Sequence, residues 1–509
     1  MFNLLSDPVF RTDRGILTLP QLLEAMMTED CPPVCLNLRP HQEQGWFCFL
    51  AQLAAIAMDR FEGLSWKDRL LGLSNGSEDP WSLVVDNPAQ PAFLQCPWES
   101  SGDDTEFRCP DDIDVLQSKR ELTLKSSLIQ NASPDFWVFS LVCKQTLINS
   151  CGVGWAGSSR TGMKMGRAFV GVICHDAPGK TFRNHVGLML RNRLKIAGLG
   201  FAESDGKALL WMYPWPSDPE KAKGFLIGEL DPYFIDTARN YRLFNIPAGI
   251  TCKGHSMLAG SKYVFRATLP DNMAGSGDPW CPQWPGKNGP YAKGFRGDTN
   301  FRTLAHLMSA CRVGRQAGGE VMPSMCQEIL AEDRGRTDLA LLAEGFELNQ
   351  GKDPRLFRRE IPLPPIVINL GLSYLDDEDD TEDSRKTLVL SDYVKDILDL
   401  ADQVEVCLKK ATGPIQRIPG KNQIFSVFLR SVDKEFFDRL VAGLPETPCP
   451  EIPGTTRSGW FEWIAKAATQ ALEEMTEVPS VPHPNAVKAE TVLRINLAKL
   501  RRKYCGNVQ

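Results

Sequence analysis

The chain has 509 residues, of which 43% are hydrophobic and 24% are charged, as is usual for a folded protein of two or three domains. Its formal net charge of -6 argues against a general nucleic-acid coat, although a single face can still be basic. No signal-peptide pattern is present, and the most apolar stretch, residues 46–58, is too short to cross a bilayer. We therefore expect a cytoplasmic protein without a membrane partner.

The 15 cysteines are scattered along the chain and form no CxxC pair, which argues against a disulfide framework. Cys31 and Cys35 lie close together, but no second pair of ligands with zinc spacing follows them. Buried free thiols in a reducing compartment explain this pattern better than a zinc site does. We expect no metal and no cofactor.

The first part of the chain predicts short strands followed by helices. Residues 2–5 and 16–19 read as a pair of strands, and Pro20 suits the first turn of a helix. Residues 42–60 form a long apolar run that predicts a buried helix, and residues 66–73 predict a shorter one. The following residues mix short apolar runs with many Gly and Pro, which indicates a large mixed α/β body.

An acidic run at residues 376–380, continued by Glu382 and Asp383, marks the sharpest change of character in the chain. A solvated linker is the simpler explanation for such a run, and an acidic docking site is the alternative. The predicted domains are therefore an N-terminal body at 1–374, a linker at 375–386 and a C-terminal domain at 387–509.

After the linker, apolar residues recur at helical spacing in four separate segments. Connectors rich in Gly and Pro separate these segments, so we expect a four-helix bundle. The predicted class is α+β, with the mixed α/β body followed by this C-terminal four-helix bundle. The four stripes are Leu390, Val394, Ile397, Ala401, Val404 and Leu408; Phe436, Phe437, Leu440, Val441 and Leu444; Trp460, Trp463, Ile464, Ala467, Ala471, Leu472 and Met475; and Ala486, Ala489, Leu493, Leu497, Leu500 and Tyr504.

The centre of the chain is rich in glycine and locally basic. Residues 152–157 match GxGxxG, but no apolar helix follows them, so a dinucleotide site is not expected. No acidic residue lies between Asp135 and Asp176, whereas Lys144, Arg160, Lys164 and Arg167 do. Glycines allow close backbone approach and cations neutralise phosphate, which suits contact with DNA. An ordinary hairpin with a solvated basic face remains open at this point.

No hydrolytic site is recognisable in the sequence. The six histidines show no metal-ligand spacing, and neither a GxSxG motif nor a Walker A motif is present. We therefore do not expect an enzyme, with an uncharacterised metal-dependent enzyme as the remaining alternative.

Three short segments carry a resemblance to a known family. They are residues 154–164 (GWAGSSRTGMK), residues 260–265 (GSKYVF) and residues 344–350 (EGFELNQ). Together with the order of the predicted domains, they resemble the large subunit of the type I-E CRISPR Cascade surveillance complex, the CasA family. Ala156 and Ser158 stand where that family usually has a glycine run.

The resemblance implies a DNA-binding subunit of an RNA-guided antiviral complex in a bacterium or archaeon. Such a subunit recognises the protospacer-adjacent motif (PAM) and helps to open the duplex for R-loop formation. Asn349 and Gln350 would form a wedge in the duplex, while Lys119, Arg120, Lys125 and Arg167 would contact the DNA backbone. The motif-binding residues would be Gly154, Ala156, Gly157, Ser158, Ser159, Arg160, Lys164 and Lys262.

The implied partners are the other Cascade subunits, the 5′ end of the CRISPR guide RNA, double-stranded target DNA and a helicase-nuclease recruited after the R-loop forms. The alternative is a structural scaffold of the ribonucleoprotein that does not itself read the motif.

Overall fold

The computed structural model divides the chain into two compact units. The first unit consists of Met1–Gly297, Met322–Glu328 and Asp338–Glu360, and the second of Asp298–Val321, Ile329–Thr337 and Ile361–Gln509. The described residues are 2–98, 104–115, 132–147, 166–214, 225–247, 249–255, 267–268, 277–286, 291–292, 294–295, 299–311, 321–333, 335–347, 355–372, 390–415, 423–444, 454–477 and 481–505.

Helices form the centre of the first unit. Helix α2 (Glu43–Arg60) is buried on nearly all sides, as its apolar sequence predicts, and the predicted helix at Trp66–Leu73 is α3. Helix α1 (Leu19–Thr28) begins with a capping box in which Thr18 and Gln21 bond to each other's backbone amides, with Pro20 in its first turn. Helices α5 (Pro134–Thr146) and α6 (Pro178–Ala197) pack against α2.

The prediction for the first twenty residues is wrong in the position of the first strand. The pair is formed by β1 (Phe10–Thr12) and β2 (Gly15–Leu17), which are antiparallel. The residues before β1 instead form a turn between Asn3 and Asp7, in which the backbone amide of Asn3 donates to Asp7 Oδ2 at 2.8 Å. Leu4 and Leu5 are buried in this turn, and Asn3 forms an isolated antiparallel β-bridge with Ser82.

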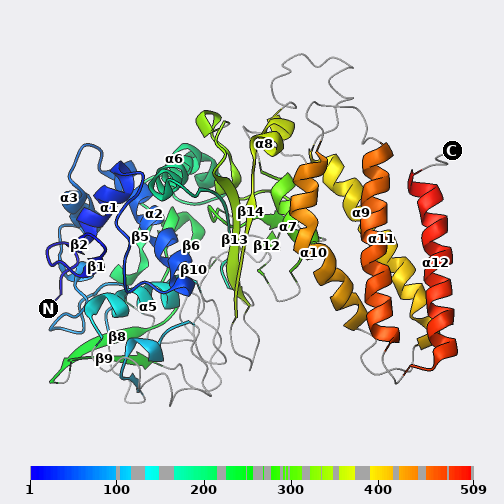
Figure 1. Ribbon diagram of the computed structural model, residues 1–509. Coiled ribbons are helices and arrows are strands. Elements are labelled where there is room, and N and C mark those ends of the chain that lie inside the picture. The colour runs from blue at the N-terminus through cyan, green and yellow to red at the C-terminus, as the bar shows by residue number, and fades with distance from the viewer. Residues whose placement is uncertain are drawn as a thin grey trace. The chain divides into compact units, whose positions relative to one another are not determined.

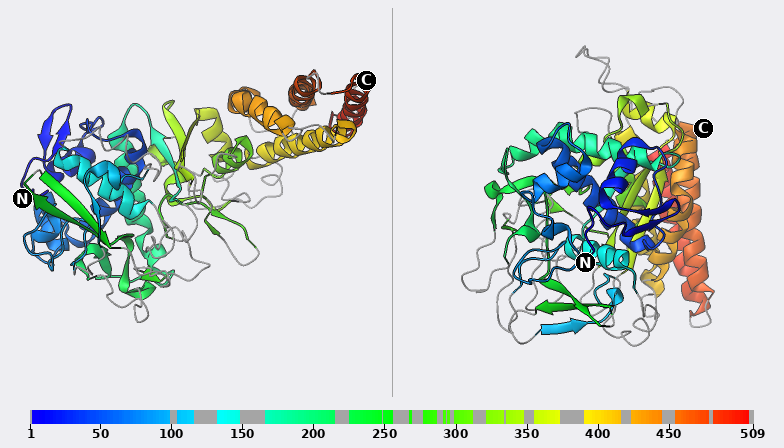
Figure 2. Two further views of the ribbon diagram at one scale, coloured as in Figure 1. Left: turned by 90° about the horizontal axis from the view of Figure 1, so that it is seen from below. Right: turned by 90° about the vertical axis from the view of Figure 1, so that its left-hand side faces the viewer.

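Among the described residues, two three-stranded sheets and several two-stranded ones accompany the helices, which confirms the α+β class. One sheet has the order β14-β13-β4, and the other, β3-β9-β8, lies at the edge of the unit opposite α6 (Figures 1 and 2). Their strands are β4 (Phe169–Cys174), β13 (Leu339–Glu347), β14 (Arg355–Pro362), β3 (Asp104–Phe107), β9 (Gly249–His255) and β8 (Tyr241–Ile246). The smaller sheets pair β5 (Lys207–Leu209) with β7 (Leu230–Ile235), β6 (Phe225–Leu226) with β10 (Ala267–Thr268), and β11 (Gln283–Trp284) with β12 (Tyr291–Ala292).

Side chains with polar ends tie the central helices to the surrounding strands. Gln52 of α2 donates from Nε2 to the carbonyl oxygen of Tyr233 at 3.0 Å. Asp231 of β7 is fully buried and receives Arg60 of α2 at 2.6 Å and Arg193 of α6 at 2.7 Å. Because a buried carboxylate needs charged or hydrogen-bonding partners, this contact fixes the two helices against one strand.

The second unit contains the four predicted helices, which run side by side in Figure 1. Their apolar stripes face inward, and only Val441, Trp463, Met475 and Tyr504 among the predicted positions are less than fully buried. The helices are α9 (Leu390–Ala411), α10 (Gln423–Gly443), α11 (Gly454–Thr476) and α12 (His483–Cys505).

Helices from before the acidic run also belong to the second unit. These are α7 (Phe301–Ser309) and α8 (Pro365–Leu372), which the sequence-based division assigns to the N-terminal body. Arg302 of α7 donates to Asp402 of α9 at 2.7 Å, and the ring of Phe301 packs at a tilt against Phe436 with centroids 4.7 Å apart. The acidic run itself lies outside the described residues.

Within the described part of the chain, no helix is both long enough and apolar enough to cross a membrane.

We predict that Phe436→Ala locally destabilises the bundle. Phe436 is fully buried between Phe301 and Trp460, so its truncation leaves a cavity and should cost about 3–5 kcal/mol. Hydrogen exchange followed by mass spectrometry should show faster exchange in α10 and α11. Asp438→Ala, on the exposed side of the same helix, is the control and should change the opening free energy by less than about 0.5 kcal/mol.

Candidate nucleic-acid interface

A small apolar cluster in the first unit joins segments that are far apart in the sequence. It lies beside the main core and links α5 with the hairpin formed by β13 and β14. Its members are Val115, Cys143, Leu147 and Phe346, with Leu356 packed against them.

The residues of this cluster flank three of the predicted DNA-contacting segments along the chain. Val115 directly precedes residues 116–131, and Leu147 directly precedes residues 148–165. Phe346 and Leu356 stand on the two strands that flank residues 348–354. Segments distant in sequence therefore have a common base in the fold.

The predicted contact residues themselves lie outside the described residues, apart from Arg167. The segment containing Lys262 follows β9, whose last residue His255 pairs with Asp104 of β3. The predicted residues outside the described part are Lys119, Arg120, Lys125, Gly154, Ala156, Gly157, Ser158, Ser159, Arg160, Lys164, Lys262, Asn349 and Gln350.

The described residues on the two sides of the glycine-rich segment lie next to each other. The Arg167 amide donates to the Leu147 carbonyl oxygen at 3.0 Å, and this hydrogen bond joins the two ends of the segment. Gly166 lies so close to β13 that an added Cβ would come within 3.0 Å of Phe346 Cβ and 3.1 Å of its carbonyl oxygen. A side chain at position 166 would therefore crowd β13 unless Phe346 shifted by a few tenths of an ångström, which favours glycine there.

The prediction that Arg167 contacts the DNA backbone is wrong, because its side chain is only 1% exposed. Arg167 Nε donates to Asp278 Oδ2 at 2.7 Å, and one terminal nitrogen donates to Gln52 Oε1 at 3.0 Å. Its guanidinium carbon also lies 5.1 Å from the ring centre of Trp280. Burial lowers the pKa of Arg167, but the Asp278 carboxylate outweighs this effect and raises it overall. Arg167 is a core residue that anchors the end of the glycine-rich segment.

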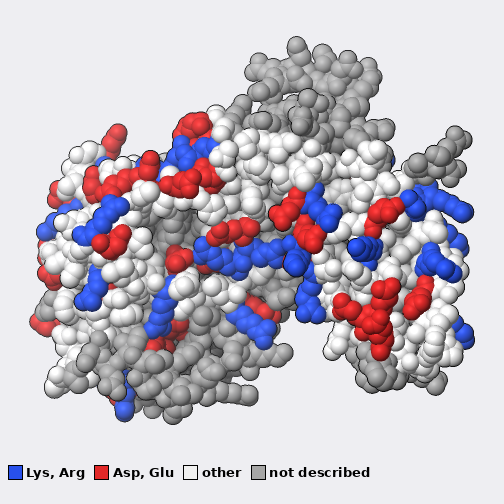
Figure 3. All heavy atoms as spheres, viewed as in Figure 1, with Lys and Arg blue, Asp and Glu red and all other residues white. Residues whose placement is uncertain are grey.

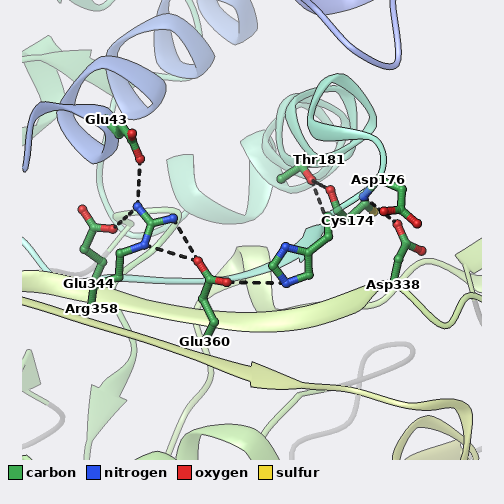
Figure 4. A network of polar contacts seen from close by, with 9 residues as sticks. Glu43, Cys174, Asp176, Thr181, Asp338, Glu344, Arg358 and Glu360 are labelled. Atoms are coloured by element: carbon green, nitrogen blue, oxygen red, sulfur yellow. Dashed lines mark hydrogen bonds and ion pairs between the residues drawn. The ribbon is translucent and has the colours of Figure 1, made fainter. Parts of the chain in front are cut away.

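The hairpin of β13 and β14 is held by a second charged group (Figure 4). Arg358 of β14 donates to Glu43 of α2 at 2.8 Å and to Glu360 at 2.9 Å. It also forms an ion pair at 3.2 Å with Glu344 of β13. One guanidinium thus joins both strands of the hairpin to the central helix.

Glu344 has a strongly perturbed carboxyl group. The residue is 1% exposed, and its Oε1 atom has no hydrogen-bond partner among the described residues. Burial raises the pKa of Glu344 to about 7, and the nearby Arg358 only partly opposes this shift. A cavity of about 270 Å³ adjoins it, lined by apolar side chains such as Phe47 and Phe169. The carboxyl group of Glu344, on strand β13 of the hairpin, is therefore expected to change its protonation near neutral pH.

Within the described residues, no group of three or more His, Cys, Asp or Glu side chains is arranged to hold a metal ion. Cys35 is buried and Cys31 is exposed, and both are free thiols. Cys31 Sγ lies 3.6 Å from the carbonyl oxygen of Asp176.

Sequence reasoning missed the residues that organise this region. In the sequence, Arg167 is one of several basic residues near a glycine-rich motif, and no local pattern points to its partners Gln52 and Asp278. A lone arginine next to buried apolar residues, at Ala168-Phe169-Val170, was the available signal for burial. The partners are more than one hundred residues away, so only the fold identifies them.

Comparisons with known proteins identify the fold. Neither protein-family models nor curated protein sequences match the chain. Among solved structures, CasA (Cse1) of Thermus thermophilus matches with a TM-score of 0.62 and 14% identity, covering 98% of this chain and 100% of that one. The CRISPR-associated protein Cse1 from Acidimicrobium ferrooxidans matches with a TM-score of 0.59 and 15% identity over 99% of both chains.

A chain of a CRISPR RNA-guided surveillance complex matches with a TM-score of 0.57 and 15% identity, covering 98% of this chain and 99% of that chain. The chain therefore has the CasA fold along nearly its whole length, as the sequence resemblance predicts.

We predict that Arg167→Ala destabilises the first unit by about 3–5 kcal/mol, because it leaves the Asp278 carboxylate buried without its cation. Urea unfolding followed by circular dichroism measures the loss. The double variant Arg167→Met with Asp278→Asn removes both charges and should recover much of the stability. A double variant no more stable than Arg167→Ala would contradict this account.

A second prediction concerns pH. The pKa of Glu344 is about 7 in the folded chain and near its ordinary value of 4.5 when unfolded. The folded state therefore binds more protons between these values, and the free energy of unfolding falls as pH rises through this window. Glu344→Gln stays neutral and escapes this loss, so it should gain on the order of 2–3 kcal/mol over the wild type at pH 8.

Thermal unfolding of both proteins between pH 5 and pH 8 measures this gain. Glu43→Gln is the matched control, because Glu43 bonds the same arginine but is 47% exposed, and should show no such gain. An equal Tm difference between Glu344→Gln and the wild type at pH 5 and pH 8 would refute the assignment.

Proposed function

We propose that the chain is the large subunit of an RNA-guided DNA surveillance complex of the type I-E Cascade kind. The observation that carries this proposal is the CasA fold, which extends over 98% or more of this chain in each comparison described. A likeness of that extent includes both the mixed body and the bundle, not one common domain alone. The proposed partners are the other subunits of the complex and its guide RNA.

We further propose that the first unit reads the protospacer-adjacent motif. The support is the common base of the three segments, since residues 116–131, 148–165 and 348–354 all adjoin one apolar cluster. Contacts from several loops can act on one stretch of duplex only if their bases are close together and rigid. The minor groove presents a degenerate pattern, so a few donors such as Arg160 and Lys262 would read it loosely.

The hairpin is proposed to act as the wedge that opens the duplex. Asn349 and Gln350 belong to the segment that connects β13 and β14 in the sequence, and Arg358 joins both strands to α2. Separating a base step costs a few kcal/mol, so a wedge must be held rigidly by the rest of the fold. Pairing of the guide RNA with the exposed strand offsets this cost.

The proposal assigns no catalysis to this chain. DNA degradation would be carried out by a helicase-nuclease that the complex recruits after the R-loop forms. Co-purification with a tagged neighbouring subunit tests the assembly, and it should yield a ribonucleoprotein that contains the guide RNA. Recovery of the chain alone, without RNA or other subunits, would count against the family assignment.

For the site, we predict that Lys262→Ala and Gln350→Ala each weaken binding of motif-containing DNA by the assembled complex. A lost contact to a base edge is worth about 1–3 kcal/mol, which corresponds to roughly five- to hundredfold in affinity. Electrophoretic mobility shift and R-loop footprinting measure the change. Lys253→Ala removes an exposed lysine of β9 and should leave both unchanged.

If both variants assemble and bind as the wild type does, the assignment of these residues fails. If motif discrimination also survives replacement of residues 152–164 by a glycine-serine linker, the chain acts as a scaffold without reading the motif.

A further inference from the structure

Helix α12 differs from the rest of the chain in its charge. The whole chain has 57 basic and 63 acidic residues, whereas α12 has six basic residues and a single acidic one, Glu490. Helix α10, by contrast, carries equal numbers of each, and α9 carries more acids than bases. The six basic residues are Lys488, Arg494, Lys499, Arg501, Arg502 and Lys503.

All of these charges lie away from the buried side of the helix. The residues of α12 that pack into the bundle are Ala486, Ala489, Leu493, Leu497 and Leu500. Lys488, Lys499 and Arg502 are separated by eleven and three residues, so at 3.6 residues per turn they form a line on the opposite side. All six basic side chains are exposed. From Lys488 to Lys503 the basic face extends about 22 Å along the helix.

Most of this charge is not balanced within the bundle. Arg501 forms an ion pair with Glu462 of α11 at 2.7 Å. For the other five, no ion pair is formed with any residue that the structure describes. Figure 3 shows Lys and Arg gathered along the α12 side of the bundle. Like charges at neighbouring helical positions repel one another, so the face gains stability from an anionic partner.

The chemistry of the face selects the kind of partner. It presents a row of cations suited to a regular series of phosphates. Proteins that bind single strands usually add aromatic side chains on which bases stack. The aromatic residue of α12, Tyr504, is half-buried and donates to Asp396 at 2.5 Å, so it offers no stacking surface. A duplex, whose bases are already stacked, fits this face better than a single strand.

We propose that the outer face of α12 binds the phosphate backbone of double-stranded DNA without reading its sequence. The site is separate from the segments assigned to motif recognition and does not depend on them. It would hold duplex DNA along the bundle through charge alone.

The test uses the full-length chain and a 30-base-pair duplex of arbitrary sequence. Fluorescence anisotropy gives the affinity over a series of salt concentrations. Each phosphate contact contributes about 0.9 to the slope of log K against log salt, so Lys499→Gln with Arg502→Gln should lower the slope by nearly 2. Its affinity at 50 mM salt should fall about tenfold or more.

The matched control is Arg430→Gln with Lys434→Gln, which removes the same two charge types from the exposed side of α10. It should leave the slope unchanged, and circular dichroism should show both double variants folded. Equal slopes for the two double variants, or no duplex binding by the wild type at low salt, would overturn the proposal.

The same anisotropy measurement with a single-stranded 30-mer tests whether the site prefers a duplex. If the single strand binds more tightly than the duplex and loses the same affinity on substitution of α12, the assignment to duplex DNA is wrong. Lack of guide RNA or of motif preference would defeat the proposed function but would leave these results unaffected.

Discussion

The ion pair between Arg167 and Asp278 is the contact on which the arrangement of the first unit depends. It is buried and joins the end of the glycine-rich segment to the central helix through Gln52. A buried charge tolerates little displacement, because any loss of its partner leaves the other group desolvated and unpaired. The backbone amide of Arg167 also donates to the carbonyl oxygen of Leu147, on the other side of the glycine-rich segment. The residues that flank the glycine-rich segment on both sides are thus fixed in the first unit.

The same principle applies to the hairpin. Arg358 joins β13, β14 and α2 through three carboxylates, one of which is the buried Glu344. The apolar cluster around Phe346 lies between the hairpin and α5. Packing and charge together therefore bring the residues that flank three distant segments to one place.

In the second unit, the helices have similar apolar stripes but differ in the charge of their exposed sides. All four helices bury one face in the same way, but α12 alone has a strongly basic outer face. The packing of the bundle does not require this charge, since the buried positions of α12 are Ala and Leu. The net charge of the whole chain is negative and gives no sign of the basic exposed side of α12, which is found only when the charges are placed on the helix.

The sequence by itself determined the helices of the bundle, the long helix α2 and the shorter helix α3, because apolar periodicity is a local property. It also pointed to the CasA fold through three short segments. It misplaced the first strand, because Asn3 and Asp7 form a turn that apolar patterning does not register. Only the tertiary structure decided that Arg167 is a core residue and that α7 packs with the bundle. Both depend on partners about one hundred residues away, and local pattern carries no information about which distant residue will neutralise a charge.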